Sequence, residues 1–452
     1  MGQPETWASR NGFILATVGS AVGIGSIWKF PYEVGANGGG AFVLVYALGL
    51  ALVVVPLLFA ELAIGRRGAG DAATSLATVA VAEGRSARWA GVGVLGALTS
   101  FGILSYYSVI GGWTLAYAVD TAVRGLPGAD AAAVQGRFDS FLASGGLMTL
   151  THGLFLAAVA AVVARGVQRG IERSMKVLMP LLGVLLVSLA VWSSVEGDAA
   201  EAARFLFVPD FGDLSGRAVL DALGLGFFSI GVGLGLMITY AAYSAPETDL
   251  REVAVVSVLA DSAVSLVAGM AVFPIVFAHG LDPASGPGLV FVSLPLAFAD
   301  LPGARVAAVA FFLLLFVAAL ASATSMLEAV AAVLGRRLGW GRRRAVAVAG
   351  AAAFVVGLIT VGSFNWWADV HPLGFIDRYA TATAYDLLDE LTSNVLLPLG
   401  GLALAIFAGW VTAGRVVASE LDLHPRGLAQ LRLLLRFVAP ALIVAATIGA
   451  LA

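Results

Sequence analysis

The stretch Gly19–Pro31, GSAVGIGSIWKFP, lies inside a segment that is apolar enough to cross a bilayer. It nevertheless contains three glycines, a lysine and a proline. Glycine weakens a helix by about 1 kcal/mol per residue, and proline removes a backbone hydrogen-bond donor. Because lipid tolerates irregular backbone only where it faces protein or a wet cavity, the stretch predicts a helix that is interrupted at membrane depth.

A second stretch, Ser229–Tyr240 (SIGVGLGLMITY), has the same character and opens the second half of the chain. Paired interrupted helices in corresponding positions are typical of the binding sites of secondary transporters. Close helix packing of the small-xxx-small type is an alternative interpretation of Gly19 and Gly23. It does not account for the neighbouring lysine and proline, nor for the glycines of the second stretch.

Composition places the chain in a membrane. Of its 452 residues, 60% are hydrophobic and 12% are charged, and its mean hydropathy is +0.93. A soluble protein carries about 25% charged residues, so a polytopic all-α membrane protein is predicted. The chain has no cysteine, and its four histidines lack metal-ligand spacing, which argues against thiol chemistry and a zinc enzyme.

Apolar runs of about 20 residues predict eleven membrane-spanning helices. They cover roughly residues 11–36, 41–65, 90–123, 146–164, 177–195, 218–245, 252–279, 304–334, 345–362, 384–413 and 432–451. With a cytoplasmic N-terminus, the inner loops receive the clustered basic residues and the outer loops only scattered arginines, such as Arg124 and Arg137. This asymmetry predicts a multi-pass protein of the cell (inner or plasma) membrane with its C-terminus outside.

Two outer connections are long enough to need a prediction of their own. Residues 196–217 read as a polar loop, and residues 280–303 as a re-entrant or capping hairpin because proline and glycine interrupt them. The basic clusters are short and lack interleaved aromatic residues, so no nucleic-acid partner is expected.

The residues then match a known family. WASRNGFILATVGSAVGIGSIWKFP (7–31), SYYSVIGGW (105–113), FFSIGVGLGLMITYAAY (227–243), ALASATSMLE (319–328) and DLLDELTSNVLLPLGG (386–401) follow one another in the expected order. The chain resembles the neurotransmitter:sodium symporters, most closely their bacterial eleven-span amino-acid carriers. The resemblance implies a leucine-transporter-type fold of two inverted five-helix repeats, 1–200 and 218–413, followed by an eleventh helix at 432–451.

The resemblance also implies a substrate site between the first and sixth helices. The substrate carboxylate would meet backbone N–H groups near Ile24 and Gly25 and the hydroxyl of Tyr107. Gly23 stands where monoamine carriers of the family have an aspartate, which favours an amino-acid substrate. The implied substrate-binding set is Ala21, Gly23, Ile24, Gly25, Ile103, Tyr107, Phe228, Ser229, Gly231, Gly233, Leu234, Ser322 and Met326. Its side-chain pocket is apolar, although core packing explains Ile103, Leu234 and Met326 equally well without the resemblance.

A first sodium site would use Ala21, Ser26, Ser229 and Asp261. An aspartate in an apolar helix costs roughly 2.5–3.5 kcal/mol, so it marks a functional site unless hydrogen bonding explains it. Relatives that need chloride bind it near the positions of Tyr46 and Ser265. Asp261 already supplies a negative charge one turn from Ser265, and we expect it to replace chloride, which would then not be required.

A second sodium site would use Gly19, Val22, Ala318 and Ser322. Its neighbouring hydroxyl position is Ala321, so one ligand is missing unless water or Thr324 supplies it. The resemblance therefore implies one or two sodium ions.

Gating residues complete the comparison. Lys29 and Asp389 match the outer charged gate; snorkelling of Lys29 and helix N-terminal charge are the alternatives. Trp7 and Tyr243 match inner-gate positions. The usual inner salt bridge is not expected, because Pro4 and Arg336 occupy its two positions.

Glu61 is expected to accept hydrogen bonds from the interrupted sixth helix, or alternatively to carry a proton. Together these features predict a sodium-coupled symporter that imports a hydrophobic or aromatic L-amino acid by alternating access, and not an enzyme. A carrier of a small osmolyte or other amino-acid derivative, and a sensor that does not transport, are the alternatives. Its expected partners are the amino acid and membrane lipid; the sequence predicts no oligomeric state.

Overall fold

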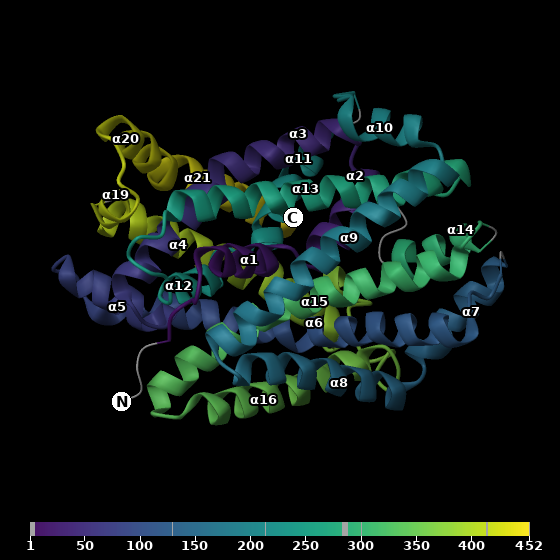
Figure 1. The fold of residues 1–452 in the computed structure, drawn as a ribbon, viewed down its shortest axis with the longest axis horizontal. Helices are drawn as coiled ribbons and strands as arrows, with labels where there is room; N and C mark the ends of the chain where they lie inside the picture. The colour runs from purple at the N-terminus through teal and green to yellow at the C-terminus, as the bar shows by residue number, and fades with distance from the viewer. Residues whose placement is uncertain are drawn as a thin grey trace.

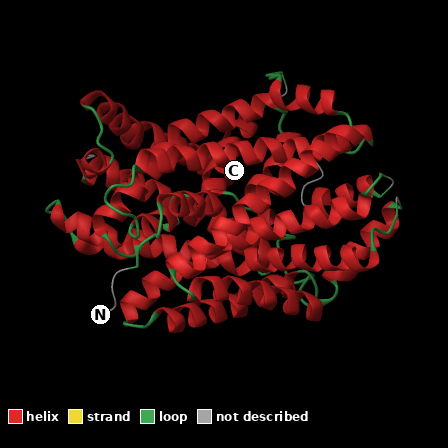
Figure 2. Cartoon of the chain, viewed as in Figure 1, coloured by secondary structure: helices red, strands yellow, loops and turns green. Residues whose placement is uncertain are grey.

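The computed structural model describes residues 5–128, 130–212, 214–282, 288–299, 301–412 and 415–451. In these ranges the chain is helical, and the one strand-like pairing is an isolated bridge between Gly39 and Pro209 (Figure 2). The first half contains α1 (Arg10–Ala21), η1 (Gly25–Lys29), α2 (Phe30–Ala36), α3 (Gly40–Gly49), η2 (Leu50–Val54), α4 (Val55–Gly68), α5 (Ala72–Ala82), η3 (Ala87–Trp89), α6 (Ala90–Arg124), α7 (Ala131–Leu142), α8 (Gly145–Ala164), η4 (Val167–Glu172), α9 (Arg173–Glu196) and α10 (Ala199–Phe207). The second half contains α11 (Gly216–Ile230), α12 (Leu236–Ala241), α13 (Leu250–Ala278), η5 (Leu289–Ser293), α14 (Leu294–Phe298), α15 (Ala304–Leu338), α16 (Arg342–Ser363), η6 (Asp377–Tyr379), α17 (Ala384–Asp389), η7 (Glu390–Leu396), α18 (Leu397–Ile406), η8 (Phe407–Val411), α19 (Arg415–Glu420), α20 (Pro425–Leu433), η9 (Leu434–Val438) and α21 (Ala439–Leu451).

Nine continuous helices within the described ranges are long and apolar enough to cross a membrane. They are Gly40–Gly68, Ala87–Arg124, Gly145–Ala164, Val167–Glu196, Leu250–Ala278, Ala304–Leu338, Arg342–Ser363, Ala384–Val411 and Pro425–Ala450. The bent pair Arg10–Ala21 and Gly25–Ala36 makes a tenth when it is taken as one span. The remaining predicted span, 218–245, is present as α11 and α12 with irregular backbone between them, so the count of eleven spans stays a prediction.

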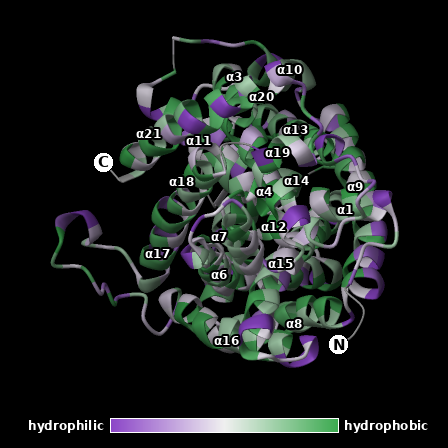
Figure 3. Cartoon of the chain, turned by 90° about the vertical axis from the view of Figure 1, so that its left-hand side faces the viewer, coloured by the Kyte–Doolittle hydropathy of each residue, from purple (hydrophilic) through white to green (hydrophobic). Residues whose placement is uncertain are grey.

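The two 35-residue helices α6 and α15 lie side by side at the centre of the bundle (Figure 1). Glycine permits close packing around them: a Cβ on Gly112 of α6 would lie 2.7 Å from the backbone nitrogen of His152 in α8. At the periphery, α9 exposes Val184 and Val191. The bundle's rim is largely hydrophobic, as a lipid-facing surface requires (Figure 3).

The spans give the bundle two ends. We call the end with Arg66 and Arg342 the inner end and the end with Arg124 the outer end, following the predicted topology. The inner end is at the left of Figure 1, where α5 and α19 lie, and the outer end at the right, where α7, α10 and α14 lie.

The prediction of a polar loop over 196–217 is wrong for its first half, because Ala199–Phe207 forms helix α10. The Asp198 side chain caps this helix by accepting the Glu201 N–H at 2.9 Å, and Ala202 and Leu206 are buried. The acidic residues around the helix hid this short apolar stripe.

Part of the predicted hairpin at 280–303 lies outside the described residues, namely 283–287 and 300. The described part contains the short helices η5 and α14. Phe291 is fully buried there, with its ring 5.5 Å from that of Trp28 and 5.8 Å from that of Trp113. This segment therefore packs on the outer half of the first span, and its role as a cap stays a prediction.

Candidate functional site

The first interrupted helix breaks where the glycines predicted it. Helix α1 ends at Ala21, Val22 has extended backbone angles, and the two halves are bent by 53°. A Cβ on Gly23 would lie 3.0 Å from the Tyr107 hydroxyl and 3.2 Å from Ser322 Oγ. Glycine at position 23 thus lets two polar side chains approach the unwound backbone.

The second interruption separates α11 from α12. Gly231, Gly233 and Gly235 have φ angles of +71°, +93° and +73°, which side chains rarely adopt. The Gly233 N–H, which has lost its helical partner, donates a 2.7 Å hydrogen bond to the fully buried Glu61. The prediction that Glu61 accepts hydrogen bonds from this helix is confirmed, and Glu61 stabilises the irregular backbone.

A cavity lies between the two interruptions. Its lining residues are Ser20, Gly23, Gly25, Ile103, Tyr107, Phe228, Ser229, Gly231, Leu234, Leu236, Ser322, Met326 and Leu397. At the polar end, the Ile24 N–H donates to the Tyr107 hydroxyl at 3.1 Å. Ser20, Ser229 and Ser322 also line the cavity, and Ile103, Phe228, Leu234, Leu236, Met326 and Leu397 supply apolar side chains. The cavity therefore offers a backbone donor and a hydroxyl to one end of a ligand and hydrocarbon surface to the other.

Three hydroxyl groups donate hydrogen bonds to Asp261 of α13. Its carboxylate accepts hydrogen bonds from Ser26 at 2.5 Å, from Ser229 at 2.9 and 3.0 Å, and from Tyr46 at 3.1 Å. Asp261 is completely buried. Ser265, one turn further, has a buried hydroxyl without a hydrogen-bond partner among the described residues. An all-oxygen cluster with one negative charge suits a hard cation such as sodium.

Around the second predicted sodium site, the structure brings α15 against α1. Ser322 Oγ donates to the Ser20 carbonyl at 3.3 Å, and Ser20 Oγ donates to Ser325 Oγ at 2.8 Å. Thr324, the suggested replacement ligand, donates to Leu320 of its own helix at 2.7 Å. Ser322 is thus the hydroxyl that faces the break in α1.

The predicted outer pair of Lys29 and Asp389 is not formed in this structure. Lys29 Nζ lies 4.8 Å from the centre of the Phe228 ring, and Asp389 accepts a hydrogen bond from Ser393 at 2.8 Å. Lys29 and Phe228 also line an outer cavity together with Asp221. Phe228 lines both cavities, so its ring separates the central cavity from the outer one.

At the inner end, Trp7 joins the N-terminal segment to the turn after α12. Its backbone N–H donates to the Tyr243 carbonyl at 3.0 Å, and its indole N–H donates to the Tyr240 carbonyl at 2.9 Å. The two predicted inner-gate residues, Trp7 and Tyr243, are therefore in direct contact.

An ion pair that the sequence analysis did not identify lies next to them. Arg342 binds Glu328 through two hydrogen bonds of 2.5 and 2.9 Å, and it also pairs with Glu5. The sequence predicted only that the family's usual inner salt bridge is absent and did not identify another contact; here Arg342 joins its own helix α16 to Glu328 of α15 and to Glu5 of the N-terminal segment. Of the two positions that motivated that prediction, Pro4 lies outside the described residues, and Arg336 lies 4.0 Å from Asp71.

Comparison with known proteins identifies the family. The sequence model of the sodium:neurotransmitter symporter family matches residues 4–136 and 136–448. The chain belongs to this family. The chain is similar to YhdH, an uncharacterized sodium-dependent transporter of Bacillus subtilis (strain 168), with 38% identity over 405 residues covering 90% of this chain and 87% of YhdH. An uncharacterized sodium-dependent transporter of Haemophilus influenzae is 31% identical over 416 residues, covering 90% of both chains.

The fold agrees with the family. The crystal structure of MhsT in complex with L-phenylalanine matches with a TM-score of 0.90 and 40% identity, covering 99% of this chain and 100% of MhsT. The predicted all-α, leucine-transporter-type fold is confirmed, and the chain is a sodium-dependent symporter of the sodium:neurotransmitter symporter family.

Ten of the thirteen substrate residues expected from the symporter family line the central cavity. Ala21, Ile24 and Gly233 do not line it, and Gly233 instead packs on the backbone of Gly401. The expectation missed three lining residues, Ser20, Leu236 and Leu397. Ser20 directly precedes the expected Ala21, whereas Leu236 and Leu397 are the first residues of α12 and α18, and no motif in the sequence pointed to them.

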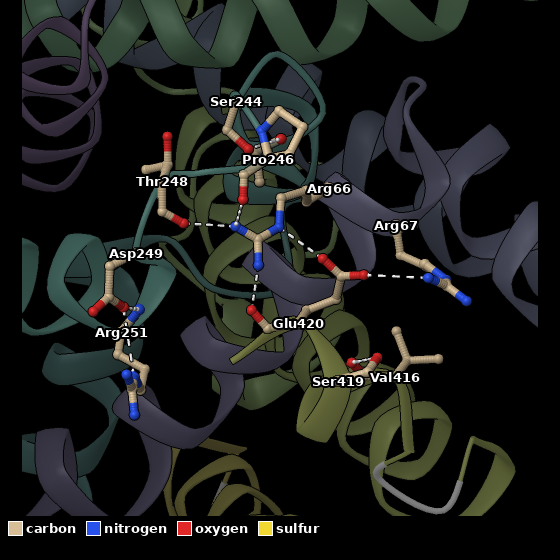
Figure 4. A network of polar contacts seen from close by, with 11 residues as sticks. Arg66, Arg67, Ser244, Pro246, Thr248, Asp249, Arg251, Val416, Ser419 and Glu420 are labelled. Atoms are coloured by element: carbon tan, nitrogen blue, oxygen red, sulfur yellow. Dashed lines mark hydrogen bonds and ion pairs between the residues drawn. The ribbon is translucent and has the colours of Figure 1, made fainter. Parts of the chain in front are cut away.

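A further polar network joins three inner segments of this symporter (Figure 4). Arg66 at the end of α4 binds the Glu420 carboxylate at 2.7 Å and the Thr248 carbonyl at 2.6 Å, and it also contacts the Glu420 carbonyl. Arg67 lies 3.6 Å from the same carboxylate. The short helix α19 is thereby fixed to α4 and to the loop after α12.

Proposed function

We propose that this symporter imports a hydrophobic or aromatic L-amino acid together with sodium. The observation that carries the proposal is the central cavity: the Tyr107 hydroxyl lines it and accepts the Ile24 N–H, and most of the other side chains that line it are apolar. A carboxylate inserted there would accept hydrogen bonds from both groups. Ionised acceptors form stronger hydrogen bonds than neutral ones. Replacing the hydrogen bond between Ile24 and Tyr107 by hydrogen bonds from both groups to the carboxylate therefore favours binding.

The rest of the cavity favours an apolar side chain. Ile103, Phe228 and Met326 offer no hydrogen-bonding groups from their side chains, and burying a leucine- or phenylalanine-sized group contributes about 1.5–3 kcal/mol. Gly23 leaves room for the carboxylate and supplies no carboxylate of its own to a bare amine. The bound L-phenylalanine of MhsT, a similar protein, supports the same substrate class.

Sodium is the coupled substrate in this proposal. The first ion would be held by Ser26, Ser229 and Asp261, beside the Ala21 carbonyl, and the bound amino-acid carboxylate would add a further oxygen. The second would be held by Ser322 and the carbonyls of Gly19, Val22 and Ala318. Because Thr324 donates within its own helix, the second site has few ligands, and one or two ions per cycle are both compatible with the geometry.

Asp261 also determines, in this proposal, whether transport requires chloride. A buried carboxylate beside the first sodium site supplies the negative charge that chloride provides in chloride-dependent relatives. We therefore propose transport without chloride.

Alternating access would expose the central cavity first at the outer end and then at the inner end. In this cycle the first, second, sixth and seventh predicted spans move against a scaffold that includes the third, fourth, eighth and ninth, with the N-terminus in the cytoplasm and the C-terminus outside. Phe228 and the Lys29–Asp389 gate would control the outer path. The Trp7, Tyr243 and Arg342 contacts would control the inner path.

Uptake by proteoliposomes tests the proposal. With an inward sodium gradient, labelled L-phenylalanine, L-tryptophan or L-leucine should accumulate above its equilibrium level, and choline in place of sodium should abolish the accumulation. Gluconate in place of chloride should leave it unchanged. Accumulation of betaine alone would favour the osmolyte carrier, and saturable binding without accumulation would favour the sensor.

A further inference from the structure

A groove on the lipid-facing side of the bundle lies far from the transport site. It has a volume of about 660 Å³ and is lined by the end of α6, the start of α8 and the short helix α7. Figure 1 shows α7 at the outer end of the bundle. Its lining residues are Leu115, Ala116, Tyr117, Val119, Asp120, Val123, Arg124, Arg137, Ser140, Phe141, Ser144, Leu147, Thr151 and Leu154. None of them lines the central or outer cavity.

The groove runs along α6 and α8. On α6 it extends from Arg124 to Leu115, nine residues or about 14 Å of helix. On α8 it extends over a similar length, from Ser144 to Leu154. Half of a ~30 Å hydrocarbon core has the same depth, so the groove is long enough to hold one acyl chain of the leaflet at the outer end.

The walls suit an acyl chain. Val119, Leu147 and Leu154 are exposed, while the rings of Tyr117 and Phe141 are buried and form the floor. The polar groups of the lining are concentrated near the outer ends of the two helices. Thr151, the deepest hydroxyl, is turned back to the Leu147 and Met148 carbonyls of its own helix.

The rim carries a net positive charge. Arg124 is 77% exposed and lies 3.3 Å from Asp120, and it has no other ion pair or hydrogen bond among the described residues. Arg137 pairs with the same carboxylate and donates to the Gly125 carbonyl at 2.7 Å. Two guanidinium groups thus share one carboxylate, and the terminal nitrogens of Arg124 remain free to bind an anion.

We propose that this groove binds a phospholipid of the adjacent leaflet. One acyl chain lies between α6 and α8, and the phosphate accepts hydrogen bonds from Arg124. The commitment to a phospholipid rests on this combination of an apolar groove long enough for one acyl chain with an excess of positive charge at the depth of the headgroups. The bound lipid fills the space beneath α7 and links this helix to the two spans.

Native mass spectrometry of the detergent-purified protein tests the site, with 1-palmitoyl-2-oleoyl phosphatidylglycerol as the probe. Arg124→Gln should weaken binding of the tightest lipid by about tenfold, as expected for the loss of one hydrogen bond to a charged group. Val119→Trp should fill the groove and abolish that binding. If Val119→Trp does not fold, Leu147→Trp fills the same groove from α8.

Matched controls come from the same end of the bundle. Arg204 is 72% exposed and lies 3.3 Å from Glu201, and Val191 is 59% exposed on α9 outside the groove. Arg204→Gln and Val191→Trp should bind the lipid as the wild type does. The proposal is overturned if the groove variants also bind like the wild type, or if diacylglycerol, which lacks the phosphate, binds as tightly. Loss of a dimer in Val119→Trp without loss of lipid would assign the groove to a second copy and overturn it as well.

Discussion

The Tyr243 hydroxyl donates a 2.7 Å hydrogen bond to Oε1 of Glu328, the same carboxylate that Arg342 holds through both of its oxygens. Glu328 is 1% exposed, so its buried charge is stabilised by the ion pair and hydrogen bonds with its partners and not by water. Tyr243 follows the interrupted sixth helix, Glu328 lies in α15 and Arg342 begins α16. The contact therefore joins the segment after α12, which follows residues that line the central cavity, to the helices α15 and α16.

Glu328→Gln should open the inner end. The substitution removes the charge that holds Arg342 and Tyr243, and a hydrogen bond to a charged group contributes about 1.5 kcal/mol, or roughly tenfold in population. Ala331 lines a cavity at the inner end together with Tyr243, Glu328 and Arg342. The chain has no cysteine, so Ala331→Cys provides a single label there. We expect a membrane-impermeant maleimide to react about tenfold faster in Glu328→Gln. An unchanged rate would show that Glu328 does not keep the inner end closed.

Asp261→Asn should create a chloride requirement. The variant keeps the shape of the site but loses the buried negative charge near Ser26, Ser229 and Tyr46. The partnerless Ser265 hydroxyl is available to help bind the anion. Sodium-driven uptake in chloride and in gluconate measures the effect, with Ser262→Ala as a neighbouring control. A wild type that needs chloride, or a fully active Asp261→Asn in gluconate, would contradict the proposal.

Gly23→Ala should impair substrate binding without unfolding the protein. The added Cβ would lie 3.0 Å from the Tyr107 hydroxyl, so the hydroxyl must move away from the position in which, in the proposed function, it would donate to the substrate carboxylate. Losing that hydrogen bond should weaken equilibrium binding of labelled L-phenylalanine by about tenfold. Gly183→Ala is the matched control, because nothing lies within 4 Å of its added Cβ. Equal affinities in the two variants would exclude this role for Gly23.

Gly233→Ala should destabilise the whole protein. A side chain at φ +93° costs about 1–2 kcal/mol, and here the Cβ would also lie 2.6 Å from the Gly401 nitrogen. Gly84→Ala separates the two effects, because Gly84 has φ +67° but open space around it. The apparent melting temperature should fall clearly further for Gly233→Ala than for Gly84→Ala. Similar melting temperatures for the two variants would mean that α18 moves away from position 233 at little cost in stability.

The sequence predicted the spans and the interrupted helices well because both depend on local chemistry. Apolar runs set the spans, and clustered glycines set the breaks at Gly23 and Gly233. The fifth span begins at Val167, ten residues before the prediction, because its first turns carry basic residues that lower the local hydropathy.

The polar partners were harder to predict because they depend on packing between distant segments. Glu328 and Arg342 lie in two helices joined by a tight turn, and Glu5 joins them from the other end of the chain. Family resemblance suggested Lys29 and Asp389 as partners, yet Lys29 lies over Phe228 instead. Side-chain pairing at a gate changes with conformation, and a sequence does not specify which conformation is seen.

The ion pair between Arg66 and Glu420 determines which segments of the protein move together. Helix α19 lies in the connection from the tenth to the eleventh predicted span, whereas Arg66 ends the second. When the second and sixth helices move during the proposed cycle, α19 must either move with them or lose the hydrogen bonds between Arg66 and Glu420. The group of helices that moves in the proposed cycle then contains segments from both halves of the chain, and it does not coincide with either half of the sequence.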